Sequence, residues 1–125
     1  MTVHANVMIK DEELLLQEVI PIWKTYPIDK WVFYDDNSTD NTVEMIKESF
    51  GEKSIVLNDN LPKFHEAYHR ARMFEYSRES GADFALCIDA DELMSTSMLM
   101  DFNKILNSSY DYDFLYSLYW YNVVG

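Results

Sequence analysis

The chain has 125 residues, of which 48% are hydrophobic and 26% are charged, and its formal net charge at pH 7 is −12. This length and apolar content fit one globular domain with a packed core and exclude a disordered chain. The acidic balance argues against a nucleic-acid backbone or an anionic membrane surface as the main partner. An acidic chain that handles phosphate groups would need a cation.

The cellular location is indicated by what the sequence lacks. Cys87 is the only cysteine, so an intramolecular disulfide is impossible and a reducing compartment is favoured. The N-terminus shows no basic segment followed by an apolar one, and no stretch reaches the roughly 20 apolar residues of a membrane span. We therefore expect a cytoplasmic protein without a membrane span.

Strands and helices are predicted to alternate along the chain. The strands fall at residues 3–9, 30–34, 54–57, 84–88 and 112–123, and the helices follow Asp11, Asn41, Lys63 and Met94. Such alternation favours right-handed crossovers, so the sheet should be largely parallel with helices on both faces. The last strand is rich in tyrosine, and we expect it to offer a surface for self-association or for a second domain.

Helix boundaries and faces follow from capping residues and apolar spacing. Asp11 is a candidate N-cap of the first helix, and Pro21 should kink or split that helix. Asn41 and Glu44 resemble a capping box, and Gly81 is the predicted end of the third helix. The predicted inward residues are Leu15, Val19, Ile22 and Trp23 in the first helix and Phe64, Ala67, Tyr68, Ala71 and Phe74 in the third.

The strand at 84–88 ends in Asp89, Asp91 and Glu92. In extended backbone Asp89 and Asp91 project to the same side and can share one Mg²⁺ or Mn²⁺ ion. By itself, this pattern would be as typical of acids that favour the start of the next helix. However, ligands of parallel sheets bind beyond the carboxyl ends of the strands. The acids expected at those ends are Asp11, Asp35, Asp36, Asp89 and Asp91, and their convergence favours a metal-binding edge.

Four segments resemble family 2 glycosyltransferases. Residues 34–42 resemble the D-[DN]-x-S-x-D-x-T signature, and residues 88–92 resemble the D-x-D motif. Residues 7–12 are similar to the first-strand segment of that family. Residues 71–73, with Gly81 nine positions after the arginine, resemble its A-R-N…G element, although Met73 replaces the usual asparagine. The resemblance implies a single Rossmann-like GT-A domain over residues 1–125.

The resemblance also implies a ligand and its contacts. The donor would be a nucleoside-diphosphate sugar, with uracil the commonest base, and the glycosyl group would pass to a hydroxyl acceptor with inversion. Asp35 or Asp36 would bind the base, and Mn²⁺ or Mg²⁺ would hold the diphosphate. The implied nucleotide-binding residues are Ile9, Asp11, Asp35, Asp36, Arg72, Asp89 and Ala90. The implied metal ligands are Asp89 and Asp91.

The length of the chain departs from the family pattern. Family members continue into an acceptor-binding half, which also contributes the general base. We therefore expect either a partial domain, truncated after the strand that follows D-x-D, or a minimal domain that binds the donor and obtains its acceptor half elsewhere. In both cases no catalytic base is identifiable and the chain alone is not expected to be sufficient for activity.

Two other functions stay open at this level. One is a Mg²⁺-dependent Rossmann-like phosphohydrolase, although Leu93 stands where the usual D-x-D-x-T pattern has threonine. The other is a non-catalytic module that binds nucleotide sugars or a protein partner.

Overall fold

The computed structural model describes residues 2–107 and 121–122. Its strands are β1 (Val3–Ile9), β2 (Lys30–Asp35), β3 (Ser54–Leu57), β4 (Phe84–Cys87), β5 (Glu92–Leu93) and β6 (Tyr121–Asn122). Its helices are α1 (Glu13–Trp23), α2 (Thr42–Phe50), α3 (Glu66–Glu79) and α4 (Thr96–Leu106), with a 3-10 turn, η1, at Gly51–Lys53. No helix in this part of the chain is long and apolar enough to cross a membrane.

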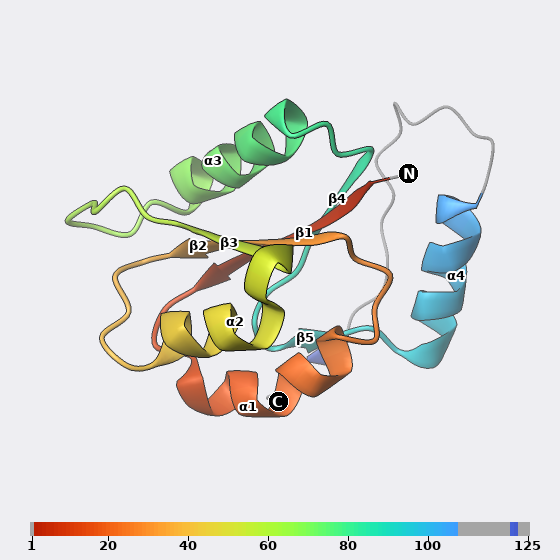
Figure 1. Cartoon of the computed structure of the whole chain (residues 1–125), viewed down its shortest axis with the longest axis horizontal. Helices are drawn as coiled ribbons and strands as arrows, with labels where there is room; N and C mark the ends of the chain where they lie inside the picture. The colour runs from red at the N-terminus through yellow and green to blue at the C-terminus, as the bar shows by residue number, and fades with distance from the viewer. Residues whose placement is uncertain (1, 108–120, 123–125) are drawn as a thin grey trace.

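The main sheet has four parallel strands in the order β3-β2-β1-β4. Helices α1 and α2 cover one face of this sheet and α3 covers the other (Figure 1). The predicted parallel α/β architecture with helices on both faces is therefore confirmed. Because the connection through α3 carries the chain from β3 past β1, the strand order reverses between β1 and β4. In such sheets this reversal opens a crevice at the carboxyl ends of the two strands.

A second, two-stranded sheet differs from the prediction. Strand β5 was not predicted, and it pairs with β6 in the antiparallel direction. The predicted fifth strand at 112–123 lies mostly outside the described residues. Its described part belongs to β6 and not to the parallel sheet.

The larger core lies between the sheet and α1 and α2. The indole of Trp23 stacks on that of Trp31 with ring centroids 5.0 Å apart, and Phe50 of α2 lies 5.2 Å from Trp31. These large rings bury much apolar surface and their offset packing adds further stabilisation. This core packs α1 and α2 against β2.

Helix α1 buries a face slightly different from the predicted one. Leu16, Val19, Ile20 and Trp23 are buried, whereas Ile22 is 42% exposed. The run of three leucines at 14–16 left the phase of the helix ambiguous, and the position of Trp23 against the sheet decides it. The helix continues through Pro21 to Trp23 without splitting, although the proline has no backbone N–H to donate.

Helix α3 turns a polar stripe toward the sheet. The predicted inward residues Phe64, Tyr68 and Phe74 are 56%, 42% and 47% exposed, and the buried residues are His69, Met73 and Ser77. The prediction of this face was wrong because β1 presents polar side chains to α3. Ser77 Oγ hydrogen-bonds with His4 Nδ1 at 2.9 Å and donates to Asn6 Oδ1 at 3.1 Å.

The start of α2 also uses a different capping residue. The Asn41 side chain makes no capping hydrogen bond. Instead, the Asp40 carboxylate accepts hydrogen bonds from the Thr42 backbone N–H at 2.9 Å and from the Glu13 backbone N–H at 3.2 Å. Asp40 thus satisfies amide groups at the starts of both α1 and α2, which ties the loops after β1 and β2 together.

Candidate functional site

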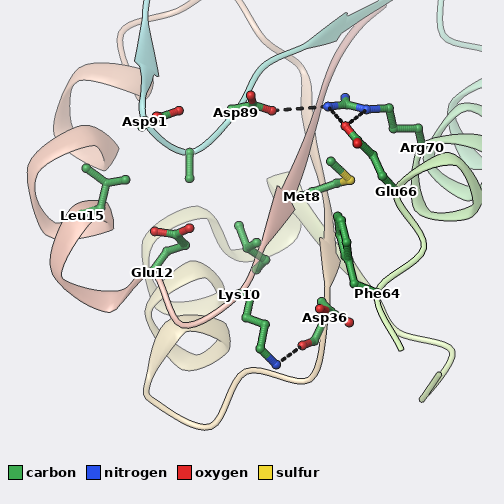
Figure 2. A pocket seen from close by; sticks show the side chains of 12 residues that line it. Met8, Lys10, Glu12, Leu15, Asp36, Phe64, Glu66, Arg70, Asp89 and Asp91 are labelled. Atoms are coloured by element: carbon green, nitrogen blue, oxygen red, sulfur yellow. Dashed lines mark hydrogen bonds and ion pairs between the residues drawn. The ribbon is translucent and has the colours of Figure 1, made fainter. Parts of the chain in front are cut away.

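A pocket of about 510 Å³ lies at the carboxyl ends of β1 and β4 (Figure 2). Five of the residues predicted from the sequence line it, namely Ile9, Asp36, Asp89, Ala90 and Asp91. Three others, Asp11, Asp35 and Arg72, do not line it. The pocket occupies the place where the strand order reverses, as expected for a ligand site in a parallel sheet.

The D-x-D residues lie in a turn rather than in extended strand. Strand β4 ends at Cys87, and the backbone N–H of Asp89 donates to Glu92 Oε1 at 2.7 Å. The backbone N–H of Glu92 donates back to the Asp89 carbonyl at 3.0 Å. The apolar residues Ile88 and Ala90 are buried, while Asp89 and Asp91 face the pocket. Buried apolar residues and acidic residues thus still alternate in this turn, and both carboxylates face the same pocket.

Arg70 is a charged pocket residue that was not predicted as a site residue from the sequence. Its guanidinium lies 3.4 Å from the Asp89 carboxylate and 3.1 Å from that of Glu66, and all three side chains line the pocket (Figure 2). Arg70 and Arg72 are two positions apart, so they project from different sides of α3. Which of them faces the pocket depends on how the helix is rotated about its axis, and the sequence alone does not give that rotation. Four further residues line the pocket and were not predicted as site residues, namely Met8, Glu12, Leu15 and Phe64. Lys10 also lines the pocket and belongs to the first-strand segment, around Ile9 to Asp11, that the family resemblance implied to lie beside the base and ribose.

Arg72 has partners elsewhere in the structure. Its Nε lies 3.3 Å from Asp59 Oδ2, and a second nitrogen lies 3.8 Å from Glu75. The hydroxyl of the buried Tyr34 also donates to Asp59 Oδ2 at 2.8 Å. Burial and this hydrogen bond to Asp59 raise the pKa of Tyr34 to about 12. Arg72 therefore joins α3 to the loop after β3.

The acids after β1 and β2 have separate roles in the structure. Asp35 is buried, and its carboxylate accepts the backbone N–H of Ser38 at 3.2 Å, so it closes the turn after β2. Asp11, at a positive φ of 48°, accepts the Thr39 backbone N–H at 2.6 Å and joins the two loops. Asp36 is the one of these acids that lines the pocket, and its backbone carbonyl accepts a hydrogen bond from Lys10 Nζ at 2.8 Å.

The charged end of the pocket is strongly acidic. Glu12, at the loop after β1, lies in the pocket with Asp91 (Figure 2). Burial, followed by repulsion from Asp91, Asp40 and Asp11, raises the pKa of Glu12. Burial also raises the pKa of Glu92, to which Asp89 and Asp91 add repulsion. A bound cation would relieve this repulsion.

Asp89 and Asp91 are the pocket residues that could contribute to a metal site. Residues 2–107 and 121–122 contain no group of three or more His, Cys, Asp or Glu side chains that could hold a metal ion. Asp89 and Asp91 nevertheless provide the hard oxygen donors that Mg²⁺ and Mn²⁺ prefer. Mg²⁺ is commonly held by one or two carboxylates together with substrate phosphates, so a complete protein cage is not required.

Comparison with solved structures defines the class of the fold. The crystal structure of S. aureus TarS 1-349 matches 86% of this chain with a TM-score of 0.68 at 17% identity, and that of S. aureus TarS matches 86% with a TM-score of 0.67 at 18% identity. The chain spans 32% and 20%, respectively, of those two chains. The fold is the GT-A fold, which confirms the predicted fold class.

The family follows from the sequence match. The model of glycosyl transferase family 2 matches residues 10–123. The chain therefore belongs to glycosyl transferase family 2, as the four sequence motifs predicted. A search of curated proteins found no match.

Proposed function

We propose that this chain is the donor-binding part of a glycosyltransferase whose donor is a nucleoside-diphosphate sugar, with a UDP-sugar the first candidate. One observation carries the proposal. Asp36, Asp89 and Asp91, from two separate motifs of the family, line one pocket with the cation Arg70. That pocket lies where parallel α/β sheets bind nucleotides.

The two ends of the pocket suit the two ends of a nucleotide. Asp36 lies at one end, near Lys10 and Phe64, and there it would accept a hydrogen bond from an N–H group of the base (Figure 2). Arg70 and the D-x-D turn lie at the other end, where the diphosphate would bind. Ile9 and Ala90 would line the path between them. Asp11 and Asp35 would act by holding the loops that shape the base site.

The chemistry of this end is the neutralisation of a leaving group. A divalent cation held by Asp89 and Asp91 would offset the diphosphate charge as the sugar–phosphate bond breaks. Arg70 would donate charge-assisted hydrogen bonds to the same diphosphate, and these strengthen as negative charge develops on the leaving group. An acceptor hydroxyl would attack the sugar with inversion, and we place the general base outside the residues assigned here.

Calorimetric titration of UDP tests the donor site. UDP should bind in the presence of Mn²⁺, and binding should be lost when EDTA replaces the metal. Asp91→Ala should abolish metal-dependent binding, because it removes a proposed metal ligand. Asp91 makes no ion pair with the described residues, so its loss should leave the fold intact. Asp101→Ala, an exposed change on α4, is the matched control and should bind as the parent does.

The titration, a phosphate-release assay and a sugar-transfer assay together separate this proposal from its alternatives. A folded protein that does not bind UDP, GDP or ADP with either metal would refute the donor site. Release of inorganic phosphate from a simple phosphate ester would favour a phosphohydrolase. Metal-dependent UDP binding by a complete gene product that transfers no sugar would favour a non-catalytic binding module.

A further inference from the structure

Phe64 is a large aromatic side chain that lies exposed in the pocket. It precedes α3, lines the pocket, and is 56% exposed. Figure 2 places its ring beside Asp36 and below Met8, on the side of the pocket away from the D-x-D turn. An exposed phenyl ring gains little from burial within its own chain, so its position in a pocket points to contact with a ligand.

Buried rings hold Phe64 in place from behind. The phenyl ring meets the imidazole of His69 edge-to-face, with centroids 5.2 Å apart and an interplanar angle of 76°. His69 is 1% exposed and stacks on the ring of Tyr34 at 3.9 Å. Neither ring nitrogen of His69 has a hydrogen-bond partner in the described part of the chain. His69 thus acts as an aromatic spacer between the β2 surface and Phe64.

The surroundings of Phe64 define the chemistry of its ligand. Met8 and Phe64 make this end of the pocket apolar, while the carboxylate of Asp36 lies beside them. A flat aromatic heterocycle with an N–H group on its edge can stack on the phenyl face and donate to Asp36. The diphosphate is assigned to the other end, where Arg70 and a cation held by Asp89 and Asp91 would offset its charge.

We propose that Phe64 is the platform on which the nucleobase of the donor stacks, with His69 and Tyr34 as its support and Asp36 as the acceptor at the base edge. This inference rests on the proposed function. It adds a residue that should strengthen the binding of ligands that contain a base and should not affect the binding of inorganic diphosphate. Stacking of a base on an aromatic side chain tolerates different bases, so Phe64 would supply affinity and Asp36 the selection of an N–H donor.

The test compares ligands that contain the base with one that does not. UDP, uridine and inorganic diphosphate are titrated calorimetrically with Mn²⁺ into the parent chain, Phe64→Ala, Phe64→Tyr and Phe74→Ala. Phe74 is the control because it belongs to α3, is 47% exposed, and does not line this pocket. Thermal unfolding confirms that each variant is folded.

Phe64→Ala should weaken UDP and uridine binding by about 10-fold to 100-fold, as expected for loss of one base–aromatic stack, and should leave diphosphate binding unchanged. Phe64→Tyr and Phe74→Ala should bind all three ligands as the parent does. The inference is overturned if Phe64→Ala binds UDP within twofold of the parent, or if it weakens diphosphate equally. Those results would leave the donor site standing, whereas absence of UDP binding to the parent chain would refute both proposals.

Discussion

The guanidinium of Arg70 lies 3.4 Å from the carboxylate of Asp89, and this ion pair joins α3 to the turn after β4. Arg70 also contacts Glu66 one turn earlier on the same helix, so two carboxylates hold its side chain at the pocket. Both ion pairs are partly exposed and contribute little to stability on their own. Their effect is to hold a positive charge beside the D-x-D motif before any ligand arrives.

Removing Arg70 should weaken donor binding. Arg70→Ala is expected to reduce UDP affinity in Mn²⁺ by about 10-fold to 100-fold, the range for loss of a hydrogen bond to a charged group. Arg70→Lys should recover part of the affinity, since lysine keeps the charge but loses the planar fork. Calorimetric titration of UDP measures both effects.

Arg72→Ala is the matched control for that experiment, because it removes the arginine that the sequence pattern had favoured. Its ion pair with Asp59 lies outside the pocket, so UDP affinity should stay within about twofold of the parent. A large loss of UDP affinity in Arg72→Ala, with none in Arg70→Ala, would return the role to Arg72.

Asp11 should act on the shape of the site rather than by contact with the nucleotide. Asp11→Ala loses the acceptor for the Thr39 amide and places alanine at a φ of 48°, which alanine adopts poorly. We expect the melting temperature to fall by about 3–6 °C. Asp11→Asn should recover most of it, because asparagine tolerates positive φ and keeps one acceptor oxygen. If Asp11→Ala abolishes UDP binding with an unchanged melting temperature, Asp11 contacts the ligand directly.

Ser77 should stabilise the fold without affecting the site. Ser77→Ala leaves His4 Nδ1 and Asn6 Oδ1 without this hydrogen-bond partner at buried positions. The expected loss is about 1–3 kcal/mol of unfolding free energy, measured by urea denaturation, with UDP affinity unchanged. Ser80→Ala, at an exposed position at the end of the same helix, is the control and should unfold like the parent. Equal unfolding of Ser77→Ala and the parent would show that the hydrogen bonds contribute nothing.

The sequence predicted the four strands of the main sheet because β1 alternates apolar and polar residues, while β2, β3 and β4 are short apolar runs that end at polar residues. It also placed Asp36, Asp89 and Asp91 together, since the carboxyl ends of parallel strands share one edge. These features depend on local pattern and on chain topology, and both are present in the sequence.

The face of α3 could not be predicted in the same way. Its exposed aromatic residues have the spacing of a buried stripe, and its buried positions include the polar residues His69 and Ser77. The choice depends on the partner surface, because His4 and Asn6 of β1 require hydrogen-bonding groups opposite them. Arg72 was expected from its resemblance to the A-R-N element of the family, whereas Arg70 is the arginine of this helix that lines the pocket. The spacing of apolar residues along a helix does not show whether the strand that the helix covers presents polar or apolar side chains.

The buried histidine of α3 should make stability depend on pH. Burial, assisted by repulsion from His65 and opposed by Asp36 and Asp59, lowers the pKa of His69 from its usual 6.5. Below pH 6.5 the unfolded chain therefore binds a proton that the folded chain does not, so stability is present above this pH and is lost as the pH falls. His4, whose pKa is lowered mainly by burial, acts in the same direction.

His69→Phe isolates the contribution of His69. Phenylalanine can keep the stack on Tyr34 and has no ring nitrogens that need hydrogen bonds. Urea denaturation at pH 7, 6 and 5 should show a smaller loss of unfolding free energy in His69→Phe than in the parent, while the contributions of His4 and of the acidic residues stay common to both proteins. At pH 7 the variant should be at least as stable as the parent, since no buried nitrogen is left unpaired at this position. Parallel pH profiles for the two proteins would show that His69 has the same proton affinity in the folded and unfolded chain.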